Sequence, residues 1–309
     1  MSKTKIEWAD VVWNPVTGCS KISPGCANCY AERFAQRLAG RCGYPEDNPF
    51  RVTIHPERLN EPSKWHKPQR IFVCSMGDLF HPDVPVDFIR KVLLAMRNFE
   101  QHIFLLLTKR PERMREAINQ ALKITDYCWP LGNVWVGVSA ENQQAADKRI
   151  PLLLQIPAAV RFVSCEPLLS AIDLSHWLTC ACDEYWPGQG HTPDCPTQNL
   201  HWCIVGGETG PGARPVHPDW VRSLRDQAVA AGVSFWFKQW GEFSSDNSHI
   251  KPGRKYPASS TLVTKTGKPY CCQAIGHSDI WMHRIGKKAA GRLLDGRTWD
   301  EYPETEVTR

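Results

Sequence analysis

Three cysteines near the start of the chain have the residue type and spacing of a metal-cluster loop. Cys19, Cys26 and Cys29 are separated by six and two residues, in a stretch broken by glycines and prolines. Cys26-x-x-Cys29 can chelate one metal centre with two thiolates, and the turns allow Cys19 to fold back as a third ligand. Three thiolates that leave one coordination position open favour an iron–sulfur cluster, here a 4Fe–4S cluster, whose fourth iron binds a substrate or a cofactor.

A zinc ion is the alternative occupant of this loop. A structural zinc site is tetrahedral, so a fourth ligand would have to come from elsewhere, for example from Cys42, Cys74 or Cys165. We expect the cluster because the cysteines lie between a strand-like run and a helix-like run. Thirteen cysteines without a secretory signal also indicate metal binding or redox chemistry rather than disulfides.

A second set of metal-type ligands lies in a polar insertion rich in glycine and proline. Cys180, Cys182, His191 and Cys195 fall within sixteen residues. Three thiols and one imidazole at this density fit a small structural zinc knuckle, which would fold a loop too short to have a core of its own. The single residue between the first two cysteines is a short gap for zinc, so an auxiliary iron–sulfur site and unused thiols remain alternatives.

The chain that must position these ligands alternates between apolar runs and helical patterns. Seven apolar runs are predicted as strands, over Val11–Trp13, Arg70–Ser75, His102–Thr108, Val134–Val138, Arg161–Cys165, Cys203–Val205 and Ser234–Lys238. Helices are predicted over Ala27–Leu38, Val86–Phe99, Pro111–Leu122, Glu141–Gln155 and Pro218–Ala231. Continuous apolar runs that alternate with helices require a parallel sheet buried on both faces. The predicted fold is therefore α/β, a full or partial (β/α) TIM-like barrel.

Composition and length constrain the rest of the molecule. The barrel is expected over residues 1–243, with the Cys/His knuckle inserted at about 176–200, and residues 244–309 are expected to form an irregular C-terminal extension packed on the barrel. The net charge of +5 is a weak field that permits an anionic partner without requiring one. The chain starts without an apolar signal core, and its apolar runs are too short for a bilayer, so we expect a cytoplasmic protein without membrane contact.

Polar side chains follow nearly every predicted strand. Because the carboxyl ends of barrel strands meet around one mouth, these residues are candidates for a single site, although each alone could be a helix cap or a solvated loop residue. The candidate catalytic residues are Glu141, Glu166, Glu208 and Lys238. The candidate cofactor-binding residues are Ser75, Asp78, Lys109, Ser139, Asn142 and Arg214.

Several specific motifs run along the chain. They are Ile6-Glu-Trp-x-Asp10 through Trp13-Asn-Pro-x-Thr-Gly-Cys19 to Cys29-Tyr-Ala-Glu32, then Ser164-Cys-Glu-Pro-Leu-Leu169, Val205-Gly-Gly-Glu208, Phe237-Lys-Gln-Trp-Gly241 and Gly286-Lys-Lys-Ala-Ala-Gly-Arg-Leu-Leu-Asp-Gly-Arg297. Together these motifs resemble those of a phage and prophage family known mainly by gene-product numbers. The resemblance covers most of the chain. Such a protein would act in the cytoplasm of the host.

That family in turn resembles the radical S-adenosylmethionine (SAM) superfamily. The resemblance implies that Cys19, Cys26 and Cys29 hold a 4Fe–4S cluster, that SAM binds the open iron, and that a flavodoxin or ferredoxin supplies electrons. It also implies hydrogen abstraction from a substrate by a 5′-deoxyadenosyl radical. Two departures are evident. The superfamily's usual cysteine spacing is three and two residues, and Asn28 occupies the position of the usual aromatic residue before the last cysteine.

Three hypotheses about function follow. The first is a radical-SAM-like enzyme that acts on an unknown small-molecule, nucleotide or nucleic-acid substrate. The second is an iron–sulfur or zinc barrel that binds nucleic acid or a partner protein without radical catalysis. The third is a zinc-stabilised hydrolase that uses strand-end carboxylates as acid and base.

Overall fold

The core of the fold is one sheet of seven parallel strands. A computed structural model describes residues 4, 6–123, 129–179, 199–245, 260–265 and 279–305. The strands, in their order across the sheet, are β1 (Val11–Trp13), β4 (Arg70–Val73), β5 (Ile103–Thr108), β6 (Val134–Ser139), β7 (Val160–Cys165), β8 (Trp202–Gly206) and β9 (Ser234–Gln239). Every adjacent pair is parallel. The α/β class and the seven predicted strands are confirmed, with ends that differ from the predicted ones by at most two residues.

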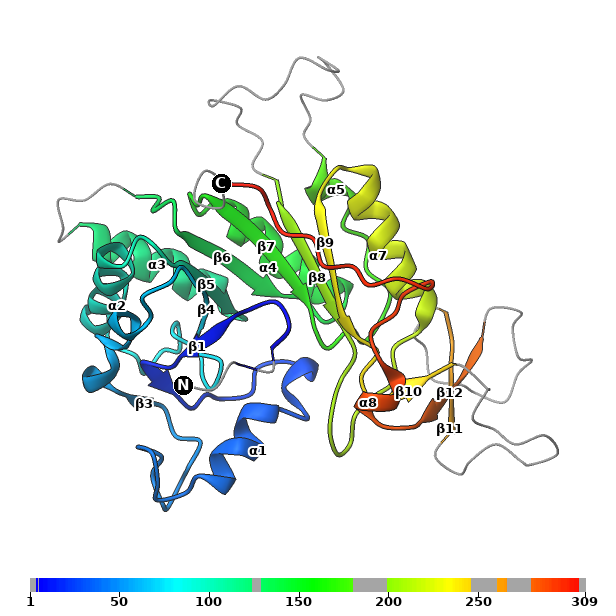
Figure 1. The fold of residues 1–309 in the computed structure, drawn as a ribbon, viewed down its shortest axis with the longest axis horizontal. Helices are drawn as coiled ribbons and strands as arrows, with labels where there is room; N and C mark the ends of the chain where they lie inside the picture. Colours follow the sequence, from blue (N-terminus) through cyan, green and yellow to red (C-terminus); the bar gives the residue numbers. More distant parts are fainter. Residues whose placement is uncertain are drawn as a thin grey trace, which may run out of the picture.

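The sheet curls into a half-barrel (Figure 1). Its strands run in sequence order from β1 to β9, and among the described residues these two strands are not bonded to each other. The structure is therefore compatible with a partial TIM-like barrel. A full barrel is not formed by the described strands.

Most helices cover the outer face of the sheet (Figure 1). They are α2 (Val86–Asn98), α3 (Pro111–Leu122), α4 (Gln143–Leu154) and α7 (Pro218–Ala230), with the shorter α5 (Ser175–Leu178). Helix α8 (Lys287–Ala290) lies instead beside the small C-terminal strands. In α2, apolar residues at helical spacing such as Ile89, Leu93 and Met96 are buried against the strands. Helix α1 (Tyr30–Arg37) begins later than predicted, because Cys29 before it has an extended ψ of 122°.

Tryptophans fill the inner face of the half-barrel. Trp202 packs edge-to-face with Trp8, Trp135 and Trp236, at interplanar angles of 90°, 86° and 89°. The indole Nε1 atoms of all four are buried without a hydrogen-bond acceptor among the described residues.

The chain after β9 departs from the strand–helix alternation. Its described strands β10 (Phe243–Ser244), β12 (Ile280–Arg284) and β11 (Ser260–Val263) form a small antiparallel sheet. The tail then returns to the half-barrel, where Phe237 N–H donates to the carbonyl of Trp299 (3.0 Å) and Glu301 N–H to that of Phe235 (3.3 Å). This tail covers the outer edge of β9. No helix among the described residues has both the length and the apolarity needed to cross a bilayer.

Candidate functional site

The three N-terminal cysteines lie on a loop at the carboxyl end of the sheet. Cys19 follows the short strand β2 (Val16–Thr17), Cys26 ends a 3-10 turn, and Cys29 immediately precedes α1. All three thiols are free and partly buried. Cys26 lies within electrostatic reach of Cys19, and Lys21 within reach of Cys26 and Cys29. We refer to residues 18–29 as the cysteine loop.

The entry to the cysteine loop is fixed by a close backbone contact. Gly18 has a φ of +83°, and its N–H donates to the carbonyl of Met76, just past β4 (2.9 Å). A Cβ at this position would lie 2.2 Å from the carbonyl oxygen of Arg51, so no larger residue fits without a shift of the backbone. Glycine is therefore required here by both its conformation and its surroundings.

A buried ion pair between the ends of β4 and β5 supports the first cysteine. Arg110 Nη1 lies 2.8 Å from Asp78 Oδ2 and 3.4 Å from Cys19 Sγ, and its Nη2 donates to the carbonyl of Ser20 (3.0 Å). Asp78 also accepts from the Thr108 hydroxyl at 2.8 and 2.9 Å. Because Arg110 and Asp78 are both buried, the guanidinium is fixed in position against the thiol.

A serine and a histidine beside Cys19 are in contact, but not in the arrangement of a hydrolytic pair. His81 Nε2 lies 2.8 Å from Ser20 Oγ, while His81 Nδ1 accepts from the backbone N–H of Asp83 (3.2 Å). Burial and the nearby Arg110 lower the pKa of His81, so the ring is neutral and its proton is on Nε2. His81 thus donates to Ser20 and does not act as its base.

The second cysteine lies in a more cationic environment than the first. Burial raises the pKa of Cys26, but Lys109 and hydrogen bonds from Ile22 and Ser23 outweigh it and bring the pKa below the ordinary value. For Cys19, burial dominates and the pKa is raised. Cys26 is therefore the thiol that deprotonates more readily, and a thiolate is the form that binds iron.

The end of β6 lies beneath the middle of the cysteine loop. A Cβ at Gly25 would lie 3.1 Å from Cδ of Glu141, which is buried and paired with Arg149 at 2.8 Å. Burial alone would raise the pKa of Glu141, but contacts with Ser23 and Arg149 outweigh burial and bring the pKa below its ordinary value. The carboxylate is therefore ionised. Glu141 is thus a charged support under the loop.

The loop after β8 holds the far side of the cysteine loop. Glu208 Oε2 accepts from Asn28 Nδ2 at 3.0 Å and from Arg214 Nε at 2.8 Å, and Glu208 Oε1 lies 2.6 Å from Arg214 Nη2. Arg214 Nη2 also donates to the carbonyl of Pro24 (3.0 Å), and Asn28 to that of Gly212 (2.7 Å). Three of these hydrogen bonds thus join the loop after β8 to the cysteine loop, at Pro24 where its 3-10 turn begins and at Asn28 just past the turn.

Glu166 and Lys238 form the remaining charged pair of the mouth. Lys238 Nζ lies 2.7 Å from Glu166 Oε1, and the two residues join the ends of β7 and β9. Tyr30 lies within electrostatic reach of Glu166, and its hydroxyl donates to the carbonyl of Ser75. Although the tyrosine as a whole is exposed, its hydroxyl points inward, and burial raises the pKa of that hydroxyl.

Two predicted cofactor-binding residues have local structural contacts. Asn142 caps α4 by accepting from the N–H of Ala145 (2.9 Å), and the carbonyl of Ser139 accepts from Arg149 (2.7 Å). The predicted residues that contact or lie near the cysteine loop or α1 are Ser75, Asp78, Lys109, Glu141, Glu166, Glu208 and Arg214, while Lys238 pairs with Glu166.

Sequence reasoning missed Arg110, Asn28 and Tyr30 as site residues. Arg110 follows Lys109 directly, and the sequence does not show which of two adjacent cations faces the first cysteine. Asn28 and Tyr30 flank Cys29, and this position next to a ligand is the signal that could have identified them.

No described residues form a ready cage for a single metal ion. Among the residues that the structure describes, no group of three or more His, Cys, Asp or Glu side chains could hold one. The proposed fourth zinc ligands are distributed elsewhere, since Cys42 is exposed, Cys74 is buried in the core and Cys165 interacts with Cys203. The predicted knuckle of Cys180, Cys182, His191 and Cys195 lies outside the described residues.

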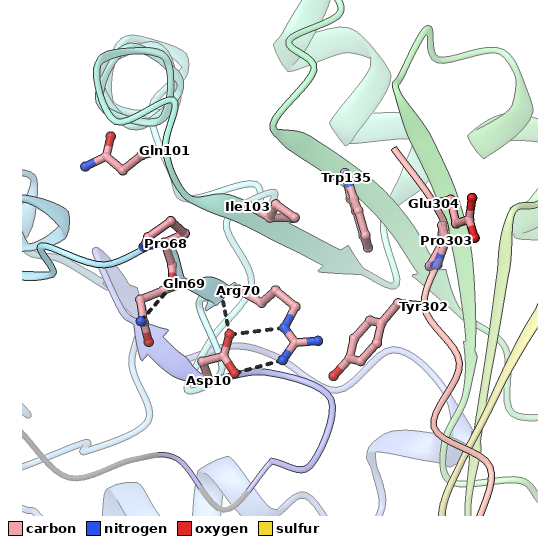
Figure 2. Close-up of a pocket in the computed structure, with 10 residues that line it drawn as sticks. All are labelled: Asp10, Pro68, Gln69, Arg70, Gln101, Ile103, Trp135, Tyr302, Pro303 and Glu304. Carbon is pink, nitrogen blue, oxygen red and sulfur yellow. Dashed lines mark hydrogen bonds and ion pairs between the residues drawn. The ribbon is translucent and has the colours of Figure 1, made fainter. Parts of the chain in front are cut away.

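A cavity of about 510 Å3 lies at the opposite, amino-terminal end of the half-barrel. Figure 2 shows Arg70 there, forked onto Asp10 and stacked on the ring of Tyr302. The guanidinium carbon is 4.0 Å from the ring centroid, and Trp135 and Ile103 form an apolar wall. None of the residues predicted for the site lies at this end.

Comparison with known proteins yields one match. A family model described as "Protein of unknown function (DUF5131)" matches residues 3–303. No curated protein and no solved structure matches the chain.

Proposed function

The chain belongs to the family of proteins of unknown function DUF5131, and we propose that it is an iron–sulfur enzyme that works in the manner of the radical SAM superfamily. Cys19, Cys26 and Cys29 are the proposed ligands of a 4Fe–4S cluster. SAM and an organic substrate are proposed to enter the mouth of the half-barrel.

The observation that carries this proposal is the way the cysteine loop is held. Arg110 fixes its first part, Glu141 lies beneath its middle, and Asn28 joins its last part to Glu208. These contacts come from the ends of β5, β6 and β8. A fold that directs buried charges from three strands onto one loop of free thiols positions that loop for a ligand.

The donor set fits an iron–sulfur cluster better than a single ion. The three thiols are free, partly buried and accompanied by Lys109 and Arg110, whose positive charge favours thiolates. In a cluster each thiolate binds a different iron, so the three sulfurs need not converge on one point. When bound and reduced, such a cluster supplies the electron that splits SAM into methionine and a 5′-deoxyadenosyl radical, which takes a hydrogen atom from the substrate.

The remaining charged groups of the mouth are proposed to orient SAM and the substrate. Glu166 and Lys238 form a partly exposed pair, so each can exchange its partner for an ammonium, carboxylate or phosphate group of a ligand. The inward hydroxyl of Tyr30 lies within electrostatic reach of this pair. Arg110 donates toward Cys19 and holds that sulfur in place.

Anaerobic reconstitution with iron and sulfide tests the cluster. We expect about four irons and four sulfides per chain, with most of the iron lost in Cys26→Ala. Cys42→Ala is the matched control, because Cys42 is free and exposed outside the loop, and it should retain full iron content. Equal iron content in the two variants, or zinc in place of iron, would contradict the proposal.

Reductive cleavage of SAM tests the radical step. The reconstituted protein, reduced with dithionite, should release 5′-deoxyadenosine from SAM, and Lys238→Ala should lower that rate while the iron content is unchanged. A loaded cluster that shows neither spectral change with SAM nor release of 5′-deoxyadenosine would exclude radical SAM chemistry and leave an iron–sulfur binding protein.

A further inference from the structure

Helix α1 presents aromatic side chains to solvent directly beside the cysteine loop. Tyr30 and Phe34 are 42% and 50% exposed, and Ile22 in the loop is 48% exposed. Most large apolar residues of the described chain are buried, so three exposed ones within thirteen residues stand out. A concentrated exposed apolar surface next to a site indicates a binding partner.

The aromatic residues of α1 form a stripe together with arginines. Tyr30, Arg33, Phe34 and Arg37 have the spacing i, i+3, i+4 and i+7, which places them on one face of the helix. The two buried residues of α1 are alanines on a neighbouring face. The Arg37 guanidinium lies 5.4 Å from the centroid of the Phe34 ring. The helix therefore leaves Phe34 and part of Tyr30 exposed to solvent and packs its two alanines against the protein.

This part of the chain is also strongly basic. Residues 19–41 contain four basic residues and one acidic residue, a net charge of +3 (four minus one), whereas the whole chain carries +5. The residues are Lys21, Arg33, Arg37 and Arg41, with Glu32. A partner for this surface should therefore carry negative charge.

The α1 face is held rigidly at the rim of the mouth. Arg33 donates to the carbonyls of Thr209 (3.0 Å) and Pro211 (3.2 Å) in the loop after β8. Tyr30 is anchored at its hydroxyl by Ser75, so the ring edge is fixed while part of the ring stays exposed. Because α1 begins directly after Cys29, a ligand bound along it would lie next to the cysteine loop.

We propose that this face of α1 binds single-stranded nucleic acid. Unpaired bases stack on Tyr30 and Phe34, and phosphates lie along Arg37 and Arg41. Aromatic rings alternating with arginines suit an unstacked strand, because the bases of a duplex are already stacked on one another. The inference rests on the proposed function, since it names nucleic acid as the substrate class of that mouth.

Fluorescence anisotropy with a labelled oligonucleotide of about 12 nucleotides tests the proposal on the full-length, reconstituted protein. At low salt we expect binding that Phe34→Ala weakens by about tenfold and that Phe34→Trp preserves. Val229→Ala on α7 is the matched control, because Val229 is 53% exposed and lies far along the chain from α1. Arg37→Gln should reduce the slope of log affinity against log salt by about 0.7.

Three results would overturn this inference. They are an absence of binding at low salt, equal affinities for Phe34→Ala and Val229→Ala, and competition by polyglutamate as effective as by the unlabelled strand. The last result would indicate an acidic protein partner instead. Because the binding measurement needs neither SAM nor an electron donor, its failure is distinguishable from failure of the radical chemistry, which the iron content and SAM cleavage report.

Discussion

The two ends of the half-barrel both contain arginine–aspartate pairs, but the pairs differ in what surrounds them. At the carboxyl end, Arg110 and Asp78 are buried and make further hydrogen bonds to the cysteine loop. At the amino end, Arg70 and Asp10 are 32% and 36% exposed and border an open cavity. The first pair positions a loop of potential ligands, and the second connects the start of the chain to its tail.

The difference indicates which end of the half-barrel holds buried charge. Buried ion pairs are costly to desolvate and persist where they fix a geometry, whereas exposed pairs contribute little to stability. Among the described residues, three charged pairs at the carboxyl end include a buried carboxylate, that of Asp78, Glu141 or Glu208. This distribution agrees with the general placement of barrel active sites at the carboxyl ends of strands.

The largest effect is expected for Arg110→Ala. The change leaves Asp78 buried without its cation, so the free energy of unfolding should fall by about 3–5 kcal/mol. Urea denaturation followed by tryptophan fluorescence measures it. Arg110→Lys keeps the positive charge but not the two-pronged guanidinium group, so it should lower the free energy of unfolding by less. A loss below about 1 kcal/mol for Arg110→Ala would show that the buried ion pair stabilises the protein no more than the exposed one does.

An intermediate effect is expected for Glu208→Gln. The amide keeps the shape of the side chain but loses the charge that binds Arg214, so we expect a loss of about 2 kcal/mol. Iron retention should fall as well, because Asn28 and the turn that carries Cys26 lose their support. Unchanged stability together with unchanged iron content would remove the assigned role of Glu208.

The contribution of the Glu208 carboxylate to the free energy of unfolding should depend on pH. Burial raises the pKa of Glu208, but hydrogen bonds from Arg214 and Asn28 bring it below its ordinary value of 4.5. A depressed folded-state pKa contributes stability that is complete above the unfolded value and is lost as the pH falls toward the folded one. The difference between the wild-type protein and Glu208→Gln should therefore be constant near neutrality and shrink below pH 4.5 in denaturation measured at stepped pH.

The smallest effect is expected for Arg70→Ala. The pair with Asp10 is partly exposed, and stacking on Tyr302 adds a modest contribution, so about 1 kcal/mol should be lost. Denaturation under the conditions used for Arg110→Ala gives the comparison directly, and reconstituted iron should stay at the wild-type level. A larger loss than for Arg110→Ala would reverse the assignment of the two ends.

Most of the fold could be predicted from sequence, because strands buried on both faces are continuous apolar runs. The half-barrel could not be distinguished from a closed one. Closure depends on whether β1 meets β9, and no residue pattern within a strand records that pairing. Helix α1 begins later than the sequence predicts, because Ala27 and Asn28 fit a helix locally while the hydrogen bonds of Asn28 to Glu208 and Gly212 hold this segment outside it.

The candidate site was only partly predictable. The strand ends could be read from the sequence, because the residue after an apolar run occupies the mouth of any parallel barrel. The hydrogen-bond partners of these side chains could not be read from the sequence. Lys109 and Arg110, for example, are adjacent cations, and the direction of each depends on the last peptide of β5. Asn142 has the same polar character as its neighbours, yet its side chain caps a helix.

The inner aromatic core joins the two chain ends around one tryptophan. Trp202 contacts Trp8 near the start of the chain, at 6.3 Å between ring centroids, and Tyr302 near its end, at 5.2 Å. During synthesis on a ribosome, this interior therefore stays incomplete until Tyr302 has emerged. Until then, the tryptophan rings around Trp202 would be incompletely packed in the nascent chain. A chain cut before Tyr302 would keep them so, which would make it a substrate for chaperones and proteases.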